Sequence, residues 1–344
     1  MRKVSIQDIA KDLGLSRNTV SKALSNSESV SFDTRQKIVK RAIEMGYKKL
    51  NPELKVELEL EQPSSRNTGN IIVLAHRYVA DFWNQIMIGI SNELKKNNYN
   101  LLFNFINCED EAAAVLPSNI HNSQIDGIIL LSVFSKEFIY KLLKTEIPLV
   151  FLDMPADGYD NNLVGDVLLV EGESSIYNIT KKLIYNGYSK IGFIGDTTYC
   201  RTIFDRWRGY KKALDDFDLS LDKNLCITEA APSHLYAYDE VSSKLGSISK
   251  LPEAFVCAND EIAMYVIRYL REKHIKVPEN IAVTGFDNTI DSTLIEPALT
   301  TVHVFKEQVG VRLVQELIWR MNNPHSPFET ILVNTDVIFR KSSD

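Results

Sequence analysis

The chain has 344 residues, a formal net charge of −6 and 44% hydrophobic residues. This length predicts two or three folding units of ordinary globular composition. No early apolar run resembles a signal peptide and no segment approaches the roughly 18 apolar residues of a membrane span, which favours the cytoplasm. The four cysteines are far apart and form no CxxC pair, so free thiols are expected in place of a disulfide framework or a zinc site.

The charge is divided unevenly along the chain. Residues 1–49 carry +6, residues 50–68 carry −2, and residues 69–344 carry −10. Basic surfaces attract phosphate backbones, whereas acidic surfaces repel them. Any nucleic acid should therefore bind only to the N-terminal unit, and we expect these three ranges to be a headpiece, a linker and a core.

The headpiece has the signals of three short helices. Ser5 followed by Asp8 is a capping-box pattern for the first helix, and Gly14 ends it. Ser16 begins the second helix, and Ser31 begins the third, SFDTRQKIVKRAIEMGY. Two helices joined by a tight glycine turn are typical of a helix-turn-helix motif. The alternative is an unrelated three-helix bundle with a solvated face.

The second helix carries side chains suited to reading DNA. Arg17, Asn18, Thr19, Ser21 and Lys22 lie at or near its N-terminal end. These groups hydrogen-bond base edges and phosphates, and a recognition helix presents them from this end in the major groove. The sequence therefore predicts DNA binding by this helix.

The segment from Val4 to Tyr47 resembles, without gaps, the headpiece of the lactose-repressor/galactose-repressor family of bacterial transcription regulators. The similarity rests on DIA, TVSKAL, VS-x-x-TR and MGY. It implies that Arg17, Asn18 and Lys22 read bases. It also implies that a set of hydroxyl side chains positions the headpiece on phosphates: Ser5, Ser16, Thr19, Ser21, Ser31 and Thr34.

The linker departs from the family pattern. The family usually has a Pro-Asn pair and then a short helix that inserts a leucine into the minor groove. This chain has KKLNPELKVELELEQPSSRNTG, whose glutamates are unfavourable in that electronegative groove. Leu54 or Leu58 remains the candidate wedge. The alternative, which we favour, is an acidic tether or a linker helix that contacts the partner subunit.

Beyond the linker, strand and helix patterns alternate. Helical stretches such as FWNQIMIGISNELKKNNY separate apolar runs, which predicts parallel sheets covered on both faces. Ten such runs fit two doubly wound α/β lobes better than one sheet. The candidate strands are NIIVLA, YNLLFNF, IDGIILLS, PLVFLD, NLVGDVLLV, SKIGFIGD, NLCITEA, EAFVCAND, IAVTGFD and TTVHV.

Polar side chains end several of these strands. Asp153, Asp196, Asn259, Asp260 and Asp287 each follow an apolar run. Open parallel sheets bind ligands at the carboxyl ends of their strands. Carboxylates and an amide there suit a ligand rich in hydroxyls, such as a sugar. The alternative is that these side chains merely cap the following helices.

From about Thr68 to about Lys341 the body resembles the ligand core of the same family. That core has the two-lobed fold of periplasmic sugar-binding proteins, and we expect the chain to cross between lobes near 165, 290 and 325. The sharper motifs are DRWRGYKKAL, CANDEIAM, VPENIAVTGFDN and PALTTVH. The resemblance implies these effector-binding residues: His76, Phe82, Trp83, Asp153, Arg201, Arg206, Asn259 and Asp287.

Single members of this set have rival interpretations. Arg206 could only pair with a carboxylate at the start of its helix, Trp83 could belong to the lobe-interface core, and His76 could be a solvated loop residue. The match of Arg201 is off by one residue. The chain also has His76-Arg77 where the family has Pro-Asp, and Glu171-Gly172 where it has Asp-Asn. These departures leave the identity of the effector open.

The sequence contains no P-loop, GxGxxG or GxSxG motif, and its histidines lack metal-binding spacing. We therefore expect no enzyme activity, cofactor or metal. The sequence predicts a repressor that binds double-stranded operator DNA under the control of a small polar effector. One headpiece reads too few base pairs, so a homodimer formed through the core is expected. The alternative is a sugar-sensing module whose headpiece does not read DNA specifically.

Overall fold

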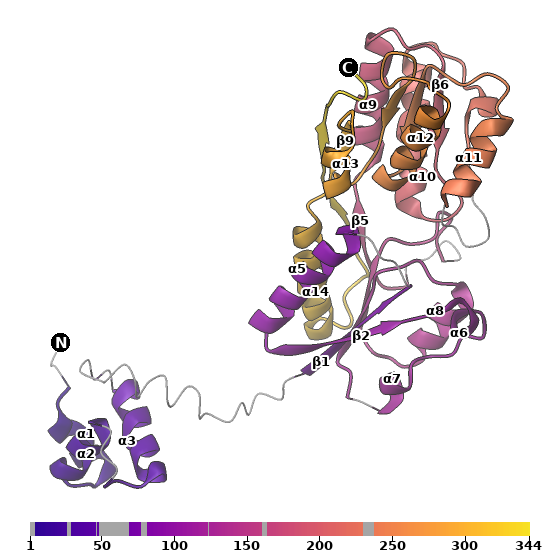
Figure 1. Ribbon diagram of the computed structural model, residues 1–344. Helices are drawn as coiled ribbons and strands as arrows, with labels where there is room; N and C mark the ends of the chain where they lie inside the picture. Colours follow the sequence, from indigo (N-terminus) through magenta and orange to yellow (C-terminus); the bar gives the residue numbers. More distant parts are fainter. Residues whose placement is uncertain are drawn as a thin grey trace. The chain divides into compact units, whose positions relative to one another are not determined.

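The computed structural model (Figure 1) describes residues 4–25, 29–45, 47, 69–76, 81–122, 124–159, 164–229 and 237–344. The chain divides into two compact units, Met1–Thr68 and Gly69–Asp344. Each unit has its own buried apolar residues. The linker prediction for residues 50–68, including the candidate wedges Leu54 and Leu58, lies outside the described residues.

The described part of the first unit contains three helices: α1 (Ile6–Leu13), α2 (Arg17–Leu24) and α3 (Phe32–Glu44). The predicted caps of the first two are confirmed. Ser5 accepts a hydrogen bond from the Asp8 amide while Asp8 accepts one from the Ser5 amide, and Gly14 ends α1 with a φ of 66°. Ser16 accepts a hydrogen bond from the Thr19 amide at 3.1 Å. These contacts satisfy amide groups that would otherwise have no partner at the helix starts.

A small core holds the three helices together. Its buried members are Ile9, Ala10, Val20, Ala23, Leu24, Val30, Ile38, Val39 and Ala42. An ion pair on the surface also joins α1 and α3. Arg41 of α3 donates to both carboxylate oxygens of Asp12 on α1, at 2.6 and 3.0 Å. This contact lowers the pKa of Asp12.

The first lobe of the second unit is a parallel sheet in the order β10-β5-β4-β3-β1-β2. Its strands are β1 (Gly69–Ala75), β2 (Tyr99–Phe105), β3 (Gly127–Leu130), β4 (Leu149–Leu152), β5 (Asp166–Val170) and β10 (Thr330–Val333). Its helices are α5 (Asp81–Lys96), α6 (Cys108–Ala112), α7 (Ser118–Asn122), α8 (Lys136–Leu143) and α14 (Lys306–Asn322).

Alternation along the strands gives this sheet two apolar faces. Ile71 and Val73 of β1 pack in the same cluster as residues of α5 and α14, whereas Ile72 and Leu74 pack with residues of α7 and α8. This is the two-residue period of a strand buried on both sides. Helices α5 and α14 lie side by side on one face (Figure 1).

The second lobe is built around the parallel strands β6-β7-β8 and an antiparallel pair, β9 with β11. The strands are β6 (Ile191–Ile194), β7 (Ala254–Cys257), β8 (Ala282–Thr284), β9 (Thr301–His303) and β11 (Asp336–Ile338). The helices are α9 (Glu173–Tyr185), α10 (Arg201–Asp216), the 3₁₀ helix η1 (Lys223–Leu225), α11 (Tyr238–Ser247), α12 (Asp260–Glu272) and α13 (Ile290–Leu294).

The expected crossings near 165, 290 and 325 are wrong. Strand β5 still belongs to the first sheet, so the first crossing follows Val170. Strand β9 still pairs within the second lobe, which places the next crossing before α14. The last crossing lies between β10 and β11. An apolar run predicts a strand but does not reveal which sheet the strand joins.

Two further strand predictions need correction. The run NLCITEA forms η1 and a single bridge between Ile227 and Ile194, not a full strand. Strands β10 and β11 were not predicted. In β10 only alternate residues are half-buried, and Leu332 is 56% exposed, so this edge strand has little of the apolar signal that a central strand has.

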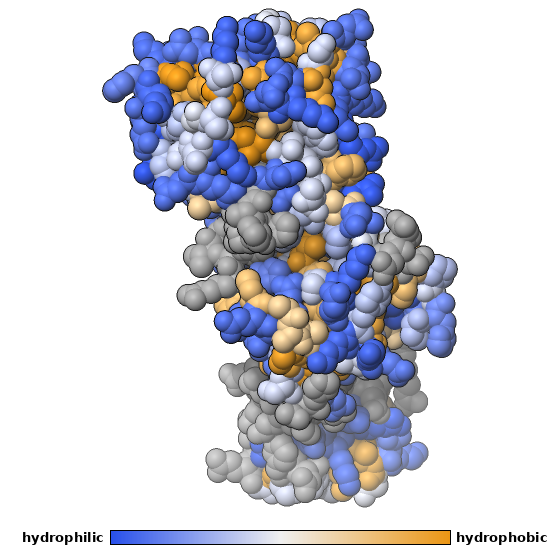
Figure 2. Space-filling model, turned by 90° about the vertical axis from the view of Figure 1, so that its right-hand side faces the viewer, coloured by the Kyte–Doolittle hydropathy of each residue, from blue (hydrophilic) through white to orange (hydrophobic). Residues whose placement is uncertain are grey.

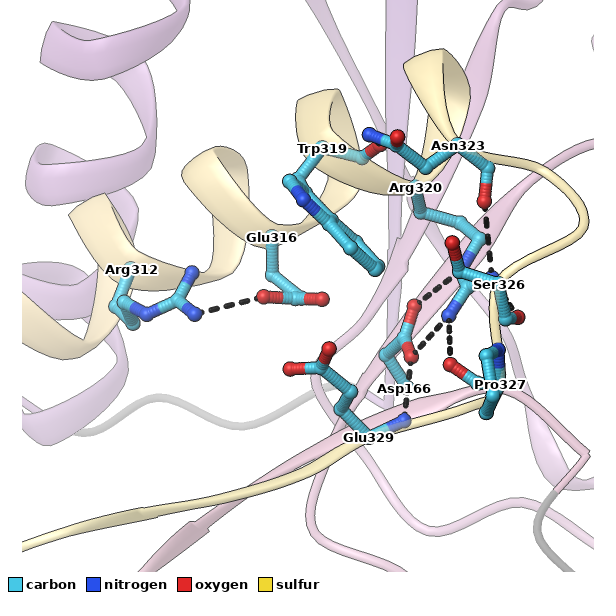
Figure 3. Close-up of polar contacts among 9 residues, drawn as sticks. All are labelled: Asp166, Arg312, Glu316, Trp319, Arg320, Asn323, Ser326, Pro327 and Glu329. Carbon is cyan, nitrogen blue, oxygen red and sulfur yellow. Dashed lines mark hydrogen bonds and ion pairs between the residues drawn. The ribbon is translucent and has the colours of Figure 1, made fainter.

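A buried ion pair ties α14 to β5. Arg320 donates through Nε and Nη2 to the two carboxylate oxygens of Asp166, at 2.6 and 2.7 Å (Figure 3). Its remaining donors reach the carbonyl oxygens of Asn323, Ser326 and Pro327. Because all its hydrogen-bonding capacity is used, the guanidinium fixes the loop that leads into β10. No helix in the described ranges is long and apolar enough to cross a membrane.

Candidate DNA-binding and effector-binding sites

The predicted recognition helix exposes the predicted base readers. Arg17, Asn18, Ser21 and Lys22 are exposed on α2, and their side chains form no hydrogen bond or ion pair within the described part of the headpiece. The opposite face of α2 is buried through the core residues Val20, Ala23 and Leu24. A rigid helix therefore presents unpaired donors and acceptors to solvent.

The predicted phosphate contacts gather at helix starts. The hydroxyl of Ser16 lies 2.8 Å from that of Thr19, and the hydroxyl of Ser31 lies 2.8 Å from that of Thr34. The hydroxyl of Ser5 donates to Asp8 at 2.6 Å. These side chains have structural roles in the headpiece. They also stand where free amide groups and the helix dipole attract anions.

In the second lobe, Arg206 contacts the residues that immediately precede Asn259 and Asp287 in the chain. Its side chain is buried on α10, and Nη1 donates to the carbonyl oxygen of Ala258 at 2.6 Å. The guanidinium lies 3.6 Å from the ring centroid of Phe286. The Nε atom is buried without a partner among the described residues. A buried donor without a partner is costly, so this atom is available to a ligand.

Asp287 follows β8 in an unusual backbone conformation, with a φ of 115°. Burial raises the pKa of its carboxyl to about 7, with a further increase from Asp260, while the positive charges of Arg206 and Lys306 act to lower it. Arg206 thus acts electrostatically on Asp287, and the two predicted effector residues lie near each other. Arg206 therefore offers a hydrogen-bond donor at this site, and the carboxyl of Asp287 offers an acceptor.

The capping interpretation holds for some strand-end residues. Asn259 accepts a hydrogen bond from the Ile262 amide at 2.8 Å and so begins α12, which leaves its Nδ2 group for a ligand. Asp260 accepts from the Thr301 hydroxyl at 2.5 Å and from the Thr289 amide at 2.8 Å. Asp260 therefore organises the loop after β8, and burial raises its pKa to about 6.

Asp153 joins the two lobes. It follows β4 of the first lobe with a φ of 71°. Its carboxylate accepts hydrogen bonds from the hydroxyl and the amide of Thr202 at the start of α10, in the second lobe. Next to it, the Arg201 amide donates to the carbonyl oxygen of Met154 at 2.9 Å. The structure thus gives Asp153 a partner across the lobe junction, and burial raises its pKa.

Two predicted effector residues have partners of their own. The Nε2 atom of His76 lies 2.7 Å from Glu111 of α6, and its ring packs at 4.6 Å from that of Phe134. Arg201 donates to Asp205 at 2.9 Å within α10. His76 is therefore neither the solvated loop residue nor a side chain free for a ligand.

Phe82 and Trp83 lie in the first turn of α5 and contact each other edge to face, with ring centroids 5.1 Å apart. Both are half-buried against the main apolar cluster, which agrees in part with the core interpretation of Trp83. Asp81, one residue earlier, helps to hold up the pKa of Lys306. The start of α5 therefore lies near Lys306 of α14, whose Nζ reaches the Asp287 and Asn288 carbonyl groups of the second lobe.

Sequence reasoning missed Lys306. This lysine at the start of α14 is buried, and its Nζ donates to the carbonyl oxygens of Asp287 and Asn288 at 2.6 and 3.1 Å. Burial lowers its pKa. The first residue of an amphipathic helix gives no sequence signal of burial, so only its contact across the lobes reveals it. No cluster of three histidines, cysteines or carboxylates suited to a metal occurs in the described part of the chain.

Comparison with known proteins matches both units. Residues 5–49 match the model for bacterial regulatory proteins of the lacI family, and residues 180–343 match that for a periplasmic binding protein-like domain. The chain is 26% identical to the HTH-type transcriptional repressor PurR of Histophilus somni and to the ribose operon repressor of Haemophilus influenzae, each over 98% of both chains.

Solved structures share the fold at lower identity. A complex of the transcriptional regulator CelR with cellobiose is 20% identical, with a TM-score of 0.69 over 99% of this chain and 100% of the other. The lac repressor dimer bound to operator and an anti-inducer is 21% identical, with a TM-score of 0.67 over 99% of each chain. The expected combination of a helix-turn-helix unit with a two-lobed α/β core is thus confirmed.

Proposed function

Because the chain belongs to the LacI family of bacterial regulatory proteins, we propose that it represses transcription by binding a two-fold symmetric operator. The observation that carries this proposal is the exposed face of α2, where Arg17, Asn18 and Lys22 have no partner among the described residues and the opposite face is buried. These side chains can donate to guanine and adenine edges in the major groove. The protein would act in the cytoplasm, without catalytic activity or a cofactor.

The regulating ligand is a small molecule rich in hydroxyl groups, most simply a sugar. Arg206, Asn259 and Asp287 supply a donor, an amide and a carboxyl in the second lobe, and Phe82 with Trp83 supplies an aromatic surface from the first. Aromatic faces beside a few placed polar groups are typical of sites that bind such ligands. A relative is named as a ribose operon repressor, and one solved neighbour contains cellobiose.

The ligand acts by its different affinity for two arrangements of the lobes. Asp153 with Thr202, and Lys306 with the Asp287 and Asn288 carbonyl groups, are contacts across the junction. A ligand bound to both lobes would change the spacing of two headpieces in a homodimer.

Site selection from a random duplex library, with the intact protein at physiological salt, tests the proposal. An enriched two-fold symmetric site supports it, and addition of a sugar panel then identifies ligands that change the affinity. If no site is enriched with or without sugars, the headpiece does not read DNA. The chain would then be a sugar-sensing module, which the binding of a sugar without any effect on DNA would identify.

A further inference from the structure

The loop after β8, formed by Asp287 and Asn288, has a backbone conformation that depends on its surroundings. Both residues have a positive φ, 115° for Asp287 and 50° for Asn288. Residues other than glycine rarely adopt this region, and they keep it only where neighbouring groups hold them there. Because the loop carries Asp287, a proposed effector residue, the groups that hold the loop also set the position of that carboxyl.

Contacts from within the second lobe hold Asn288. Its amide donates to the Thr301 hydroxyl at 3.2 Å, and its Oδ1 atom accepts a hydrogen bond from Arg340 at 2.6 Å. Its Nδ2 atom lies 2.9 Å from Nδ1 of His303. These contacts fix the amide and the side chain of Asn288, but they do not involve the carbonyl oxygens of the loop.

Lys306 binds those carbonyl oxygens from the start of α14. Its Nζ atom donates to the carbonyl groups of Asp287 and Asn288, at 2.6 and 3.1 Å. Hydrophilic residues cover much of the molecular face in Figure 2, where water can solvate them. Lys306 differs, because it is only 3% exposed. A charge removed from water is costly, so the burial of this ammonium group indicates that its contacts have a specific role.

The ammonium group of Lys306 lies between charged groups of both lobes. Burial lowers its pKa, while the carboxylates of Asp287 and Asp260 in the second lobe and of Asp81 in the first act to raise it. The chain crosses between the lobes immediately before α14. Lys306 therefore joins the loop to the first lobe at this crossing.

Helix α14 has little freedom to move without α5. The two helices lie side by side (Figure 1), and a Cβ atom on Gly89 of α5 would lie 2.1 Å from the carbonyl oxygen of Glu307, the residue after Lys306. Backbones packed this closely leave almost no space for one helix to slide past the other. A displacement of Lys306 therefore moves both helices, and α5 carries Phe82 and Trp83 in its first turn.

We propose that Lys306 is a positioning residue that holds the Asp287–Asn288 loop and couples the effector site to the first lobe. This inference rests on the proposed function, because it assigns the regulation of the same site. An effector that engages Asp287 changes the position of the loop, and the two carbonyl contacts pass that change to α14. His303 and Arg340 hold the loop from within its own lobe and cannot transmit it in this way.

Hydrogen exchange of the intact protein, without DNA or effector, tests the proposal. The amides of Asn288 and Thr289 report on the loop, since their acceptors lie in the second lobe. The amides of Arg201 and Thr202 report on the lobe junction, since they donate to residues 153 and 154 of the first lobe. Neither measurement requires a working headpiece or a bound ligand, so a failure of the proposed function would not alter the result.

Lys306→Met keeps a long apolar stem but removes the ammonium group. We expect exchange to become at least about tenfold faster at both the loop and the junction, because the two carbonyl groups lose a charged donor. Lys306→Arg keeps a charged donor and should stay within about threefold of the native chain. The matched control is Thr202→Val, which removes a different contact across the junction, the hydroxyl bond to Asp153. It should accelerate exchange at the junction alone.

Exchange in α12 shows whether each variant is folded. If Lys306→Met also exposes α12, the neutral and shorter Lys306→Gln takes its place, with an expected acceleration of at least about threefold at both sites. Unchanged exchange in the loop would show that other contacts suffice to hold it. Faster exchange in the loop alone would exclude coupling to the first lobe.

Two further results would overturn the proposal. If Thr202→Val accelerates the loop as much as Lys306→Met does, exchange in the loop reports any loosening of the junction and assigns no role to Lys306. If Lys306→Arg behaves like Lys306→Met, a positive charge at this position is not what holds the loop.

Discussion

Arg17 and Asn18 differ from the capping hydroxyls of α2 in having no partner in the described headpiece. Replacing either with alanine should therefore leave the fold intact and remove only base contacts. We expect Arg17→Ala or Asn18→Ala to lose about 1–3 kcal/mol at the selected operator. Binding to random duplex should change little. Competition titrations with both duplexes measure this ratio, and a variant that keeps full discrimination would show that the residue does not read bases.

The second prediction at the residue scale concerns how the carboxyl of Asp287 makes effector affinity depend on pH. Its pKa of about 7 means that this carboxyl group is partly protonated at neutral pH. A hydroxyl-rich effector donates hydrogen bonds to the charged carboxylate, so binding favours the deprotonated form. Affinity should therefore rise with pH through 7 and fall by up to about tenfold per unit below it.

Calorimetry of the identified effector between pH 5.5 and 8.5 measures this dependence. Asp287→Asn should bind more weakly with a nearly flat profile, because an amide does not titrate in this range. A native profile that is flat, or that rises toward acid pH, would mean that the effector does not contact this carboxylate.

The capping residues of the headpiece that the sequence predicted share one property: their signal is local. Ser5, Gly14 and Ser16 act within three or four positions of themselves, so their roles can be read from neighbouring letters. Asp153 and Lys306 act on partners in the other lobe, at Thr202 and at the Asp287 carbonyl group. Nothing near them in sequence reveals those contacts, which depend on how the two lobes are brought together.

At the scale of elements, each lobe has one tight helix pair with a glycine at the contact. A Cβ atom on Gly209 of α10 would lie 2.0 Å from the carbonyl oxygen of Glu173 at the start of α9. A Cβ atom on Gly310 of α14 would lie 2.1 Å from the carbonyl oxygen of Ile86 on α5. Both contacts are with backbone atoms, so the helices would have to separate.

Gly209→Ala should therefore lower the free energy of unfolding by about 2 kcal/mol or more, despite the better helix propensity of alanine. Gly246→Ala is the matched control, because it lies in α11 where the nearest atom to a Cβ would be 3.8 Å away. That change should stabilise by about 0.5–1 kcal/mol. Calorimetric unfolding of both variants distinguishes them, and equal stability would show that α9 and α10 can separate at little cost.

The burial of individual strands explains why some of them could be predicted from the sequence and others could not. Strands such as β3 and β4 are buried along their whole length and follow clear turn signals. Strands β10 and β11 are short and lie partly in solvent, so their pattern is weak. The order of strands in the sheets, and hence the crossings, depends on packing between distant segments, which an apolar pattern does not encode.

At the scale of the whole molecule, the proposed homodimer requires an apolar surface outside the lobe cores. Strand β2 lies at one edge of the first sheet, and its Phe103 and Phe105 are exposed with ring centroids 4.7 Å apart. Ile88, on the adjacent helix α5, is also exposed. An exposed apolar group at a sheet edge is typical of an interface.

Phe105→Lys should therefore shift the protein toward monomers and weaken operator binding, because two half-sites must be held together. Leu332→Lys is the control, since this residue is equally exposed, at 56%, on β10 at the opposite edge of the sheet. Sedimentation at micromolar concentration measures the change. If Phe105→Lys stays dimeric, the interface lies elsewhere on the core.

The order of these units along the chain has a consequence for folding during translation. The headpiece occupies the first 49 residues and has its own core, so it can fold while the rest of the chain is still being translated. Residues near position 344 complete the second lobe. Ser342 and Ser343 are buried there, and the carbonyl oxygen of Ser342 accepts a hydrogen bond from the Val283 amide. A nascent chain can therefore have a folded headpiece before the residues that complete the second lobe have been added.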